Sequence, residues 1–315
     1  MSLNIVFAGT PDFASDILQT LLQGPHSIQA VFTQPDRPAG RGRQLQMSAV
    51  KQLAMRHNIP VYQPSSLKTP EEQALLQALK PDLFLVVAYG LILPSAVLSM
   101  PKYGCWNVHA SLLPHWRGAS PIQQAILQGD SLSGVTIMQM DAGLDTGDII
   151  SLHPCAVELR ATSETLTKRL SIIAGEALEK SLAALEQGTL SRQKQDSSKA
   201  SFAPKISKAA AKINWNQTAI QIDRQIRAYN PWPIAFFEID HQAVRVFSAE
   251  PLPSAEGSGP PGLILAVSKH GVDVATADGI LRLLELQFPG GKRQNVAAIL
   301  HSKKSLFQPG LELPV

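Results

Sequence analysis

Two kinds of hydrophobic pattern alternate along the first third of the chain. Continuous apolar runs at 3–8, 30–33 and 82–88 predict strands that are buried on both faces of a sheet. Stretches with helical spacing, at 12–22 and 51–57, lie between these runs. Strands that alternate with helices are typical of an α/β fold, here a doubly wound domain with a mostly parallel sheet. Ligands bind such sheets at the carboxyl ends of the strands.

The last third of the chain has a different pattern. A helix is predicted at 219–228, and the segment Asn230-Pro231-Trp232-Pro233 ends it. Five short apolar runs punctuated by glycine and proline follow between residues 235 and 286, which indicates a small barrel or sandwich. A polar stretch rich in Gln, Ser and Lys precedes this region. We therefore expect a first domain at 1–188, a linker at 189–204 and a second domain at 205–315.

Composition limits the classes of protein that this chain can represent. Its 315 residues are 44% hydrophobic and 17% charged, as in an ordinary globular protein. The start of the sequence lacks the basic and apolar regions of a signal peptide, and the longest apolar stretch, 83–94, is too short to span a bilayer. The two cysteines, Cys105 and Cys155, suggest neither a disulfide framework nor a metal site. We expect a cytoplasmic protein without a membrane partner.

The positive charge is concentrated in the last third. Residues 205–315 contain 12 Lys and Arg and 9 Asp and Glu, a net charge of +3, which leaves 16 of each and no net charge in residues 1–204. A second basic stretch, 34–51, carries four basic residues against Asp36. An excess of this size is compatible with a polyanionic partner, although solvated charged surfaces have the same composition.

The strongest chemical signal is the pair Asn107 and His109, which is followed about forty residues later by Asp145. On a strand, Asn107 and His109 share one face because side chains alternate with a period of two. The amide and the imidazole then offer a hydrogen-bond donor and a titratable group to the same substrate atom, and a carboxylate can orient the imidazole. This combination favours acyl transfer through a tetrahedral intermediate without a covalent nucleophile.

Several segments carry a family resemblance that spans most of the chain. Residues 107–122 and 138–147 closely resemble the signature of the 10-formyltetrahydrofolate-dependent formyltransferases. Further segments resemble the methionyl-tRNA formyltransferases within that family, namely 7–14, 33–42, 87–94, 205–208, 213–215 and 226–233. The resemblance implies a Rossmann-like formyltransferase domain followed by an OB-like β-barrel. It also implies formyl transfer from 10-formyltetrahydrofolate to the amino group of methionyl initiator tRNA, without a metal or an obligate protein partner.

The resemblance assigns roles to particular residues. Asn107, His109 and Asp145 would be catalytic: Asn107 as a donor to the oxyanion, His109 at the same oxygen or in proton transfer, and Asp145 as the partner of His109. The division of proton transfer between His109 and Asp145 remains open. The turn after the strand would line the folate site through Ser111, Leu112, Leu113 and Pro114. The predicted tRNA contacts are Arg41, Arg43, Lys205 and Lys208, with the lysines on one face of a short helix.

Alternative interpretations rest on the same residues. A formyltransferase that acts on glycinamide ribonucleotide or an amino sugar nucleotide would use the same three catalytic groups, and a non-catalytic tRNA-binding protein could retain the scaffold.

A dinucleotide site is disfavoured because Gly9-Thr10-Pro11-Asp12 lacks the G-x-G-x-x-G spacing. The acidic residues of 141–148 lack the spacing of a calcium loop. His115 departs from the family signature, where arginine is common, and leaves the local charge open. The sequence predicts neither the oligomeric state nor the order of substrate binding.

Overall fold

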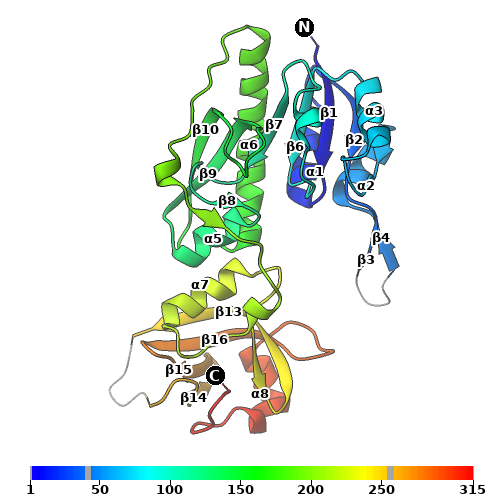
Figure 1. The fold of residues 1–315 in the computed structure, drawn as a ribbon. Helices are drawn as coiled ribbons and strands as arrows, with labels where there is room; N and C mark the ends of the chain where they lie inside the picture. The colour runs from blue at the N-terminus through cyan, green and yellow to red at the C-terminus, as the bar shows by residue number, and fades with distance from the viewer. Residues whose placement is uncertain (1, 40–43, 254–258, 315) are drawn as a thin grey trace. The chain divides into compact units, whose positions relative to one another are not determined.

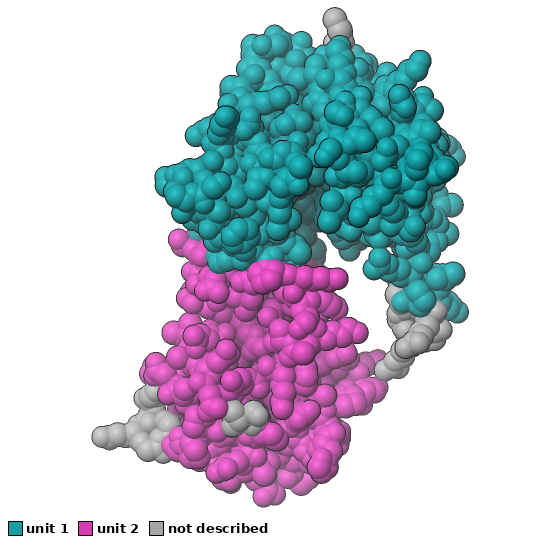
Figure 2. Space-filling view, viewed as in Figure 1, with its two compact units in different colours: residues 1–121, 132–156, 167–203 teal, residues 122–131, 157–166, 204–315 magenta. Residues whose placement is uncertain are grey.

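The computed structural model describes residues 2–39, 44–253 and 259–314, which form two compact units. Unit 1 consists of 1–121, 132–156 and 167–203, and unit 2 of 122–131, 157–166 and 204–315, within the described residues (Figure 2). Each unit therefore draws on separate stretches of the chain. The predicted linker, 189–204, does not run free: its residues up to 203 are part of unit 1, where Gln193 forms a backbone bridge with Ile149.

Unit 1 is built on a seven-stranded sheet in the order β10-β9-β7-β6-β1-β2-β5 (Figure 1). The five strands from β7 to β5 are parallel, while β9 and β10 add an antiparallel edge. The predicted strands at 3–8, 30–33 and 82–88 are confirmed as β1, β2 and β6. The strands of the sheet are β1 (Asn4–Gly9), β2 (Ser27–Phe32), β5 (Val61–Tyr62), β6 (Leu83–Val87), β7 (Cys105–His109), β9 (Leu132–Gln139) and β10 (Ile149–Ala156).

The helices predicted at 12–22 and 51–57 are confirmed as α1 and α2, and four further helices were not predicted. In α1, apolar residues three and four positions apart are buried, which directs one face of this helix into the core. The helices of the first two-thirds of the chain are α1 (Asp12–Leu21), α2 (Ala49–Arg56), α3 (Pro70–Ala78), α4 (Ser95–Leu98), α5 (Pro121–Gln128) and α6 (Ser163–Glu186). Two small sheets complete this part: β3 (Arg37–Ala39) with β4 (Gln44–Gln46), and β8 (Arg117–Gly118) with β11 (Phe202–Ala203).

Unit 2 is a curled antiparallel sheet that forms a half-barrel, consistent with the OB-like fold expected from the sequence (Figure 1). Its helix α7 (Ala219–Ala228) begins with a capping box of Thr218 and Gln221. Trp215 and Phe237 are fully buried in the hydrophobic core of this unit, with ring centroids 5.9 Å apart. The remaining elements of unit 2 are β12 (Phe236–Ile239), β13 (Gln242–Leu252), β14 (Ile264–Ser268), β15 (Gly271–Ala275), β16 (Ile280–Gln287), β17 (Gln294–Asn295), α8 (Val296–Lys303) and the 3-10 helices η2 (Ala209–Ala211) and η3 (Lys304–Leu306). A further 3-10 helix, η1 (Ser197–Lys199), belongs to unit 1.

Candidate active site

Strand β7 places Asn107 and His109 side by side at the carboxyl end of the parallel sheet. The intervening Val108 and the preceding Trp106 are buried on the opposite face. Asn107 pairs in register with Val86 of β6 and Met138 of β9, so the strand is held on both sides. The alternation expected from the sequence is therefore present, and both polar side chains project from the same face.

Asp145 reaches these two residues from the loop between β9 and β10. Its Oδ1 accepts a hydrogen bond from Nδ2 of Asn107 at 3.3 Å, and its Oδ2 lies 3.8 Å from Nδ1 of His109. The backbone N–H of Gly118 also donates to Oδ2, at 2.8 Å. Asn107 and His109 thus converge on the carboxylate of Asp145, although Asp145 lies 36 or more residues away in the sequence.

The imidazole of His109 is fixed from both sides and is only 6% exposed. Its Nε2 lies 3.0 Å from the carbonyl oxygen of Trp116. Because a carbonyl only accepts, this arrangement requires a proton on Nε2 and leaves Nδ1 facing Asp145. The orientation that the sequence argument assigned to Asp145 alone is therefore shared with a backbone carbonyl that sequence patterns do not reveal.

The loop that carries Asp145 has a constrained backbone. Asp145 has φ of +51°, in the left-handed region that L-residues rarely adopt. A side chain at residue 147 would overlap the carbonyl oxygen of Gln139, so only glycine fits there. Asp141 stabilises the turn because its Oδ1 accepts from the backbone N–H of Gly143 at 3.0 Å and from the Thr146 hydroxyl at 2.7 Å. These contacts direct the carboxylate of Asp145 toward β7.

The four residues predicted to line the folate site form a turn that begins two residues after His109. Ser111 and Leu113 are buried, while Leu112 and Pro114 are partly exposed. The Ser111 hydroxyl donates to the carbonyl oxygen of His115 at 2.5 Å, so this group stabilises the turn. The His115 side chain is exposed, and only its carbonyl is used, so its departure from the family signature leaves the turn intact. Folate contact through the turn stays a prediction.

A segment that the sequence analysis did not connect with the site lies against it. Gln195 donates to the backbone oxygens of Asp145 and Gly147 at 2.8 and 2.7 Å. Ser201 accepts from the N–H of Trp116 at 2.9 Å through its Oγ. The polar composition of 189–204, which predicted a linker, includes these side chains. Single-sequence patterns contain no signal that assigns them to the site.

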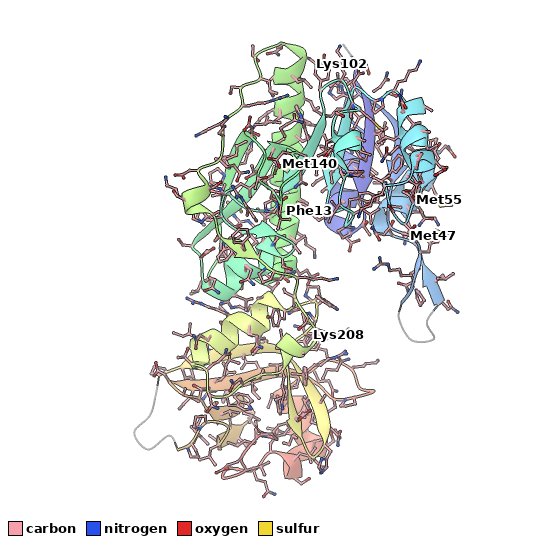
Figure 3. All side chains as sticks on the ribbon, viewed as in Figure 1. Phe13, Met47, Met55, Lys102, Met140 and Lys208 are labelled. Atoms are coloured by element: carbon pink, nitrogen blue, oxygen red, sulfur yellow. The ribbon has the colours of Figure 1, made fainter. Side chains whose placement is uncertain are left out.

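The predicted tRNA contacts divide into two groups. Arg41 and Arg43 lie outside the described residues. Lys205 and Lys208 are exposed, and Lys208 immediately precedes the single turn η2 (Figure 3). The short helix that was expected to align these lysines on one face does not include them, because only residues 209–211 are helical there.

Partnered charges reduce the positive charge of both basic stretches. Lys51 forms an ion pair with Asp36 at 2.6 Å, and this hydrogen bond is the main reason why the pKa of the Asp36 carboxyl is lowered. Lys212 forms an ion pair with Glu238 at 3.5 Å. Since these lysines already have acidic partners, they are weaker candidates for phosphate contacts than Lys205 and Lys208.

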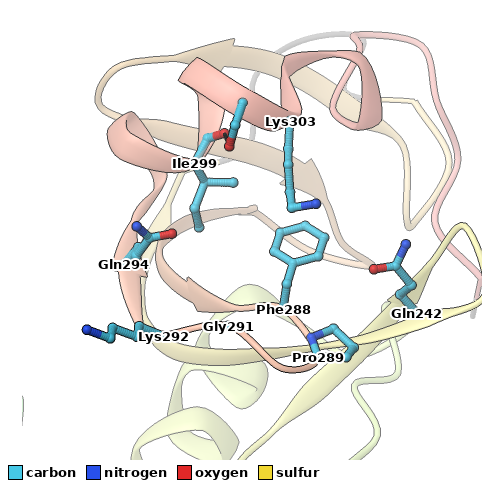
Figure 4. A pocket seen from close by; sticks show the side chains of 9 residues that line it. Gln242, Phe288, Pro289, Gly291, Lys292, Gln294, Ile299 and Lys303 are labelled. Atoms are coloured by element: carbon cyan, nitrogen blue, oxygen red, sulfur yellow. Dashed lines mark hydrogen bonds between the residues drawn. The ribbon is translucent and has the colours of Figure 1, made fainter.

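Unit 2 contains a cavity of about 150 Å³ between α8 and the chain that follows β16 (Figure 4). Phe288 and Ile299 give it an apolar floor, and the ammonium of Lys303 lies 4.8 Å from the centre of the Phe288 ring. Lys292 is exposed at the rim. The chain from residue 286 to 311 contains no acidic residue, so this side of the unit is cationic.

Two searches over the described part of the chain bear on other classes of function. No group of three or more His, Cys, Asp or Glu side chains is arranged to hold a metal ion there. No helix among these residues combines the length and apolar character needed to cross a membrane.

Comparisons with known proteins identify both parts of the chain. A family model described as formyl transferase matches residues 3–182, and one described as formyl transferase, C-terminal domain, matches residues 205–304. Among solved structures, HypX from Aquifex aeolicus is similar over 98% of this chain and 49% of its own, with 18% identity and a TM-score of 0.66. This chain therefore spans about half the length of HypX. A HypX structure in complex with tetrahydrofolic acid has a TM-score of 0.64.

Two formyltransferases of solved structure are similar over nearly their whole length. WlaRD, a sugar 3N-formyl transferase solved in the presence of dTDP and 5-N-formyl-THF, matches 93% of this chain and 100% of its own, at 19% identity and a TM-score of 0.66. An N-formyltransferase from Helicobacter canadensis, in complex with folinic acid and dTDP-3-aminofucose, matches 89% of this chain and 99% of its own, at 20% identity and the same TM-score. At these identities the likeness shows the fold.

Proposed function

This chain belongs to the formyl transferase family, and we propose that it transfers the formyl group of 10-formyltetrahydrofolate to the α-amino group of methionyl initiator tRNA. The observation that carries the proposed chemistry is the convergence of Asn107, His109 and Asp145 at the end of β7. The resulting formylmethionyl-tRNA would serve translation initiation.

The reaction needs an oxyanion donor, a proton acceptor and an oriented amine. The amine nitrogen attacks the formyl carbon, and the carbonyl oxygen becomes an oxyanion. Asn107 uses one amide N–H on Asp145, so its second N–H remains to donate to that oxygen. His109 and Asp145 accept the proton that the amine loses and deliver a proton to N10 of the folate as the carbon–N10 bond breaks. The products are the formamide and tetrahydrofolate.

A folate donor is supported by the similar proteins whose structures hold tetrahydrofolic acid, 5-N-formyl-THF or folinic acid. In this chain the donor would lie beside the turn 111–114, which adjoins His109. Leu112 and Pro114 are the members of that turn with exposed surface, so we assign the apolar contacts with the folate to them.

The chemistry of the site does not by itself select the acceptor, because the same three groups serve transfer to any amine. Methionyl-tRNA is supported by the family resemblance of 205–233 and by exposed cationic groups in unit 2, among them Lys205, Lys208 and Lys292. Phosphate groups attract such lysines at long range. An amino sugar nucleotide is the second candidate, because WlaRD and the Helicobacter canadensis enzyme match this chain over nearly their whole length.

One assay separates the two acceptors. Purified protein is mixed with 10-formyltetrahydrofolate and either methionyl initiator tRNA, uncharged tRNA or dTDP-3-aminofucose, and formylated product is measured. Formylation of the methionyl-tRNA alone is the expected result. Formylation of the amino sugar alone would overturn the tRNA assignment and retain the catalytic residues, and no transfer to either would overturn both.

A further inference from the structure

Residues 195–203, called here the supporting segment, contact the site on both sides of His109. Toward Nδ1, Gln195 bonds to the backbone of the Asp145 loop; toward Nε2, Ser201 bonds to the backbone of Trp116. Both backbone groups belong to residues whose side chain or carbonyl faces the imidazole. We infer that Gln195 and Ser201 are positioning residues for His109 in the proposed formyl transfer.

The orientation of the Gln195 amide follows from its neighbours. Its Oε1 accepts two hydrogen bonds from the guanidinium of Arg117, at 3.1 and 2.8 Å. Because guanidinium only donates, Oε1 must face Arg117 and the Nε2 group must face the carbonyl oxygens of Asp145 and Gly147. Arg117 is 4% exposed, so this contact is shielded from water. One amide thus joins a buried cation to the loop that presents Asp145.

The Asp145 backbone needs this support because of its conformation. A residue at φ of +51° persists only where its surroundings hold it there. The carbonyl of Asp145 accepts from Gln195 immediately after this strained position, and the Gly147 carbonyl accepts from the same nitrogen two residues later. Loss of both bonds would free the loop to relax, and the Asp145 carboxylate would move away from Asn107 and His109.

Trp116, on the Nε2 side of the His109 ring, also has a backbone in the left-handed region. Its φ is +59°, and its carbonyl oxygen accepts from Nε2 of His109. Ser201 holds this peptide through three hydrogen bonds. Its Oγ accepts from the N–H of Trp116, and its carbonyl oxygen accepts from the N–H of Arg117. Its own N–H donates to the carbonyl oxygen of Pro114. The two sides of the imidazole therefore depend on one short stretch of chain.

The test compares two glutamines that are two residues apart. In Gln195→Met the hydrogen bonds are lost and the side-chain length is kept, whereas Gln193→Met changes an exposed side chain whose backbone alone pairs with Ile149. We expect Gln195→Met to lower kcat about 10- to 100-fold, since a small misplacement of catalytic groups has this effect. The KM values should change little, and the melting temperature should fall because the buried Arg117 guanidinium loses its acceptor. Gln193→Met should match the wild type. Equal kcat values for all three proteins would overturn the inference.

A second pair keeps the test decisive if Gln195→Met fails to fold. Ser201→Ala removes the acceptor for the Trp116 N–H, while Ser201→Thr retains a hydroxyl. The alanine variant should lose kcat and the threonine variant should recover most of it. Equal activity of the two variants would remove Ser201 from the positioning role.

A spectroscopic measurement separates this inference from the proposed reaction. The ring nitrogens of His109 are observed by NMR in protein labelled with nitrogen-15 histidine and assigned with His109→Gln. Their chemical shifts should move in Gln195→Met and Ser201→Ala, and remain unchanged in Gln193→Met. This result requires no turnover, so it would stand even if the acceptor were not methionyl-tRNA. Unchanged His109 signals in both variants would overturn the positioning role.

Discussion

The site on β7 and the cavity of unit 2 hold their polar groups in opposite ways. At the site, His109 is nearly buried and each ring nitrogen faces a defined oxygen, while Asp145 accepts from both a side chain and a backbone N–H. Around the cavity, Lys292 is exposed, and the ammonium of Lys303 lies over an aromatic ring. Bond formation needs groups fixed to a fraction of an ångström. Attraction of phosphates acts over several ångströms, so flexible lysines suffice.

The largest effect is expected at the fixed site. Asn107→Ala removes the proposed oxyanion donor and should lower kcat about 10²- to 10³-fold, as loss of one such donor does in other enzymes. Single-turnover formyl transfer measures the change, and circular dichroism checks that the fold is retained. A variant that turns over at the normal rate would show that Asn107 is not the donor.

A smaller loss is expected where the fixed site is disturbed through its backbone. Gly147→Ala places a methyl group against the carbonyl of Gln139 and should displace the Asp145 loop, with a loss of kcat of about tenfold or more. Gly24→Ala is the matched control, because a Cβ there meets only the Leu21 carbonyl, at 3.4 Å. Steady-state kinetics measures kcat for the two variants. Equal kcat values would mean that the loop tolerates the added methyl group.

At the cavity the expected effects are modest and depend on salt. The double variant Lys292→Ala with Lys303→Ala should raise the KM for methionyl-tRNA by about tenfold and leave kcat unchanged. Each lost phosphate contact should also reduce the slope of log affinity against log salt by about one unit. KM titrations at several salt concentrations measure both quantities. Lys269→Ala, elsewhere in unit 2, is the control. A fall in kcat with an unchanged salt slope would contradict the assignment of catalysis to the site on β7 and of phosphate attraction to the lysines at the cavity.

The smallest effect concerns His153 on β10, a partly buried residue of unit 1. Its buried Nε2 has no hydrogen-bond partner among the described residues, and burial, helped by Lys180 and opposed by Glu176, lowers the pKa of its ring below 6.5. The unfolded chain therefore binds a proton first as the pH falls below 6.5, and stability that is fully present above that pH declines.

The measurement for His153 is urea unfolding at pH 7.5 and 5.5. The wild type should lose more stability between these values than His153→Gln, which has no ring to protonate. Equal losses in the two proteins would mean that the folded ring takes up its proton as readily as the unfolded one.

The sequence predicted the parts of this molecule whose signals are local. The buried runs gave the strands of the sheet, and the alternation of Asn107 and His109 on one strand gave two catalytic candidates. The supporting segment could not be predicted in this way, because Gln195 and Ser201 look like solvated residues until the chain returns to the site. The same reason explains the linker assigned to 189–204, since polar composition is shared by linkers and by segments that bond to backbone groups.

The interleaved composition of unit 2 has a consequence for how the protein is made. Arg160, from an early part of the chain, donates to the Asp223 carboxylate at 3.0 Å and to the Ala249 carbonyl at 2.5 Å, and the Ser163 hydroxyl donates to the carbonyl of Asn230 at 2.7 Å. During synthesis these residues leave the ribosome well before their partners exist. The half-barrel can therefore form these contacts only after the later partners have been synthesised. A fragment that starts at residue 204 would lack Arg160 and Ser163, the donors to Asp223, Ala249 and Asn230.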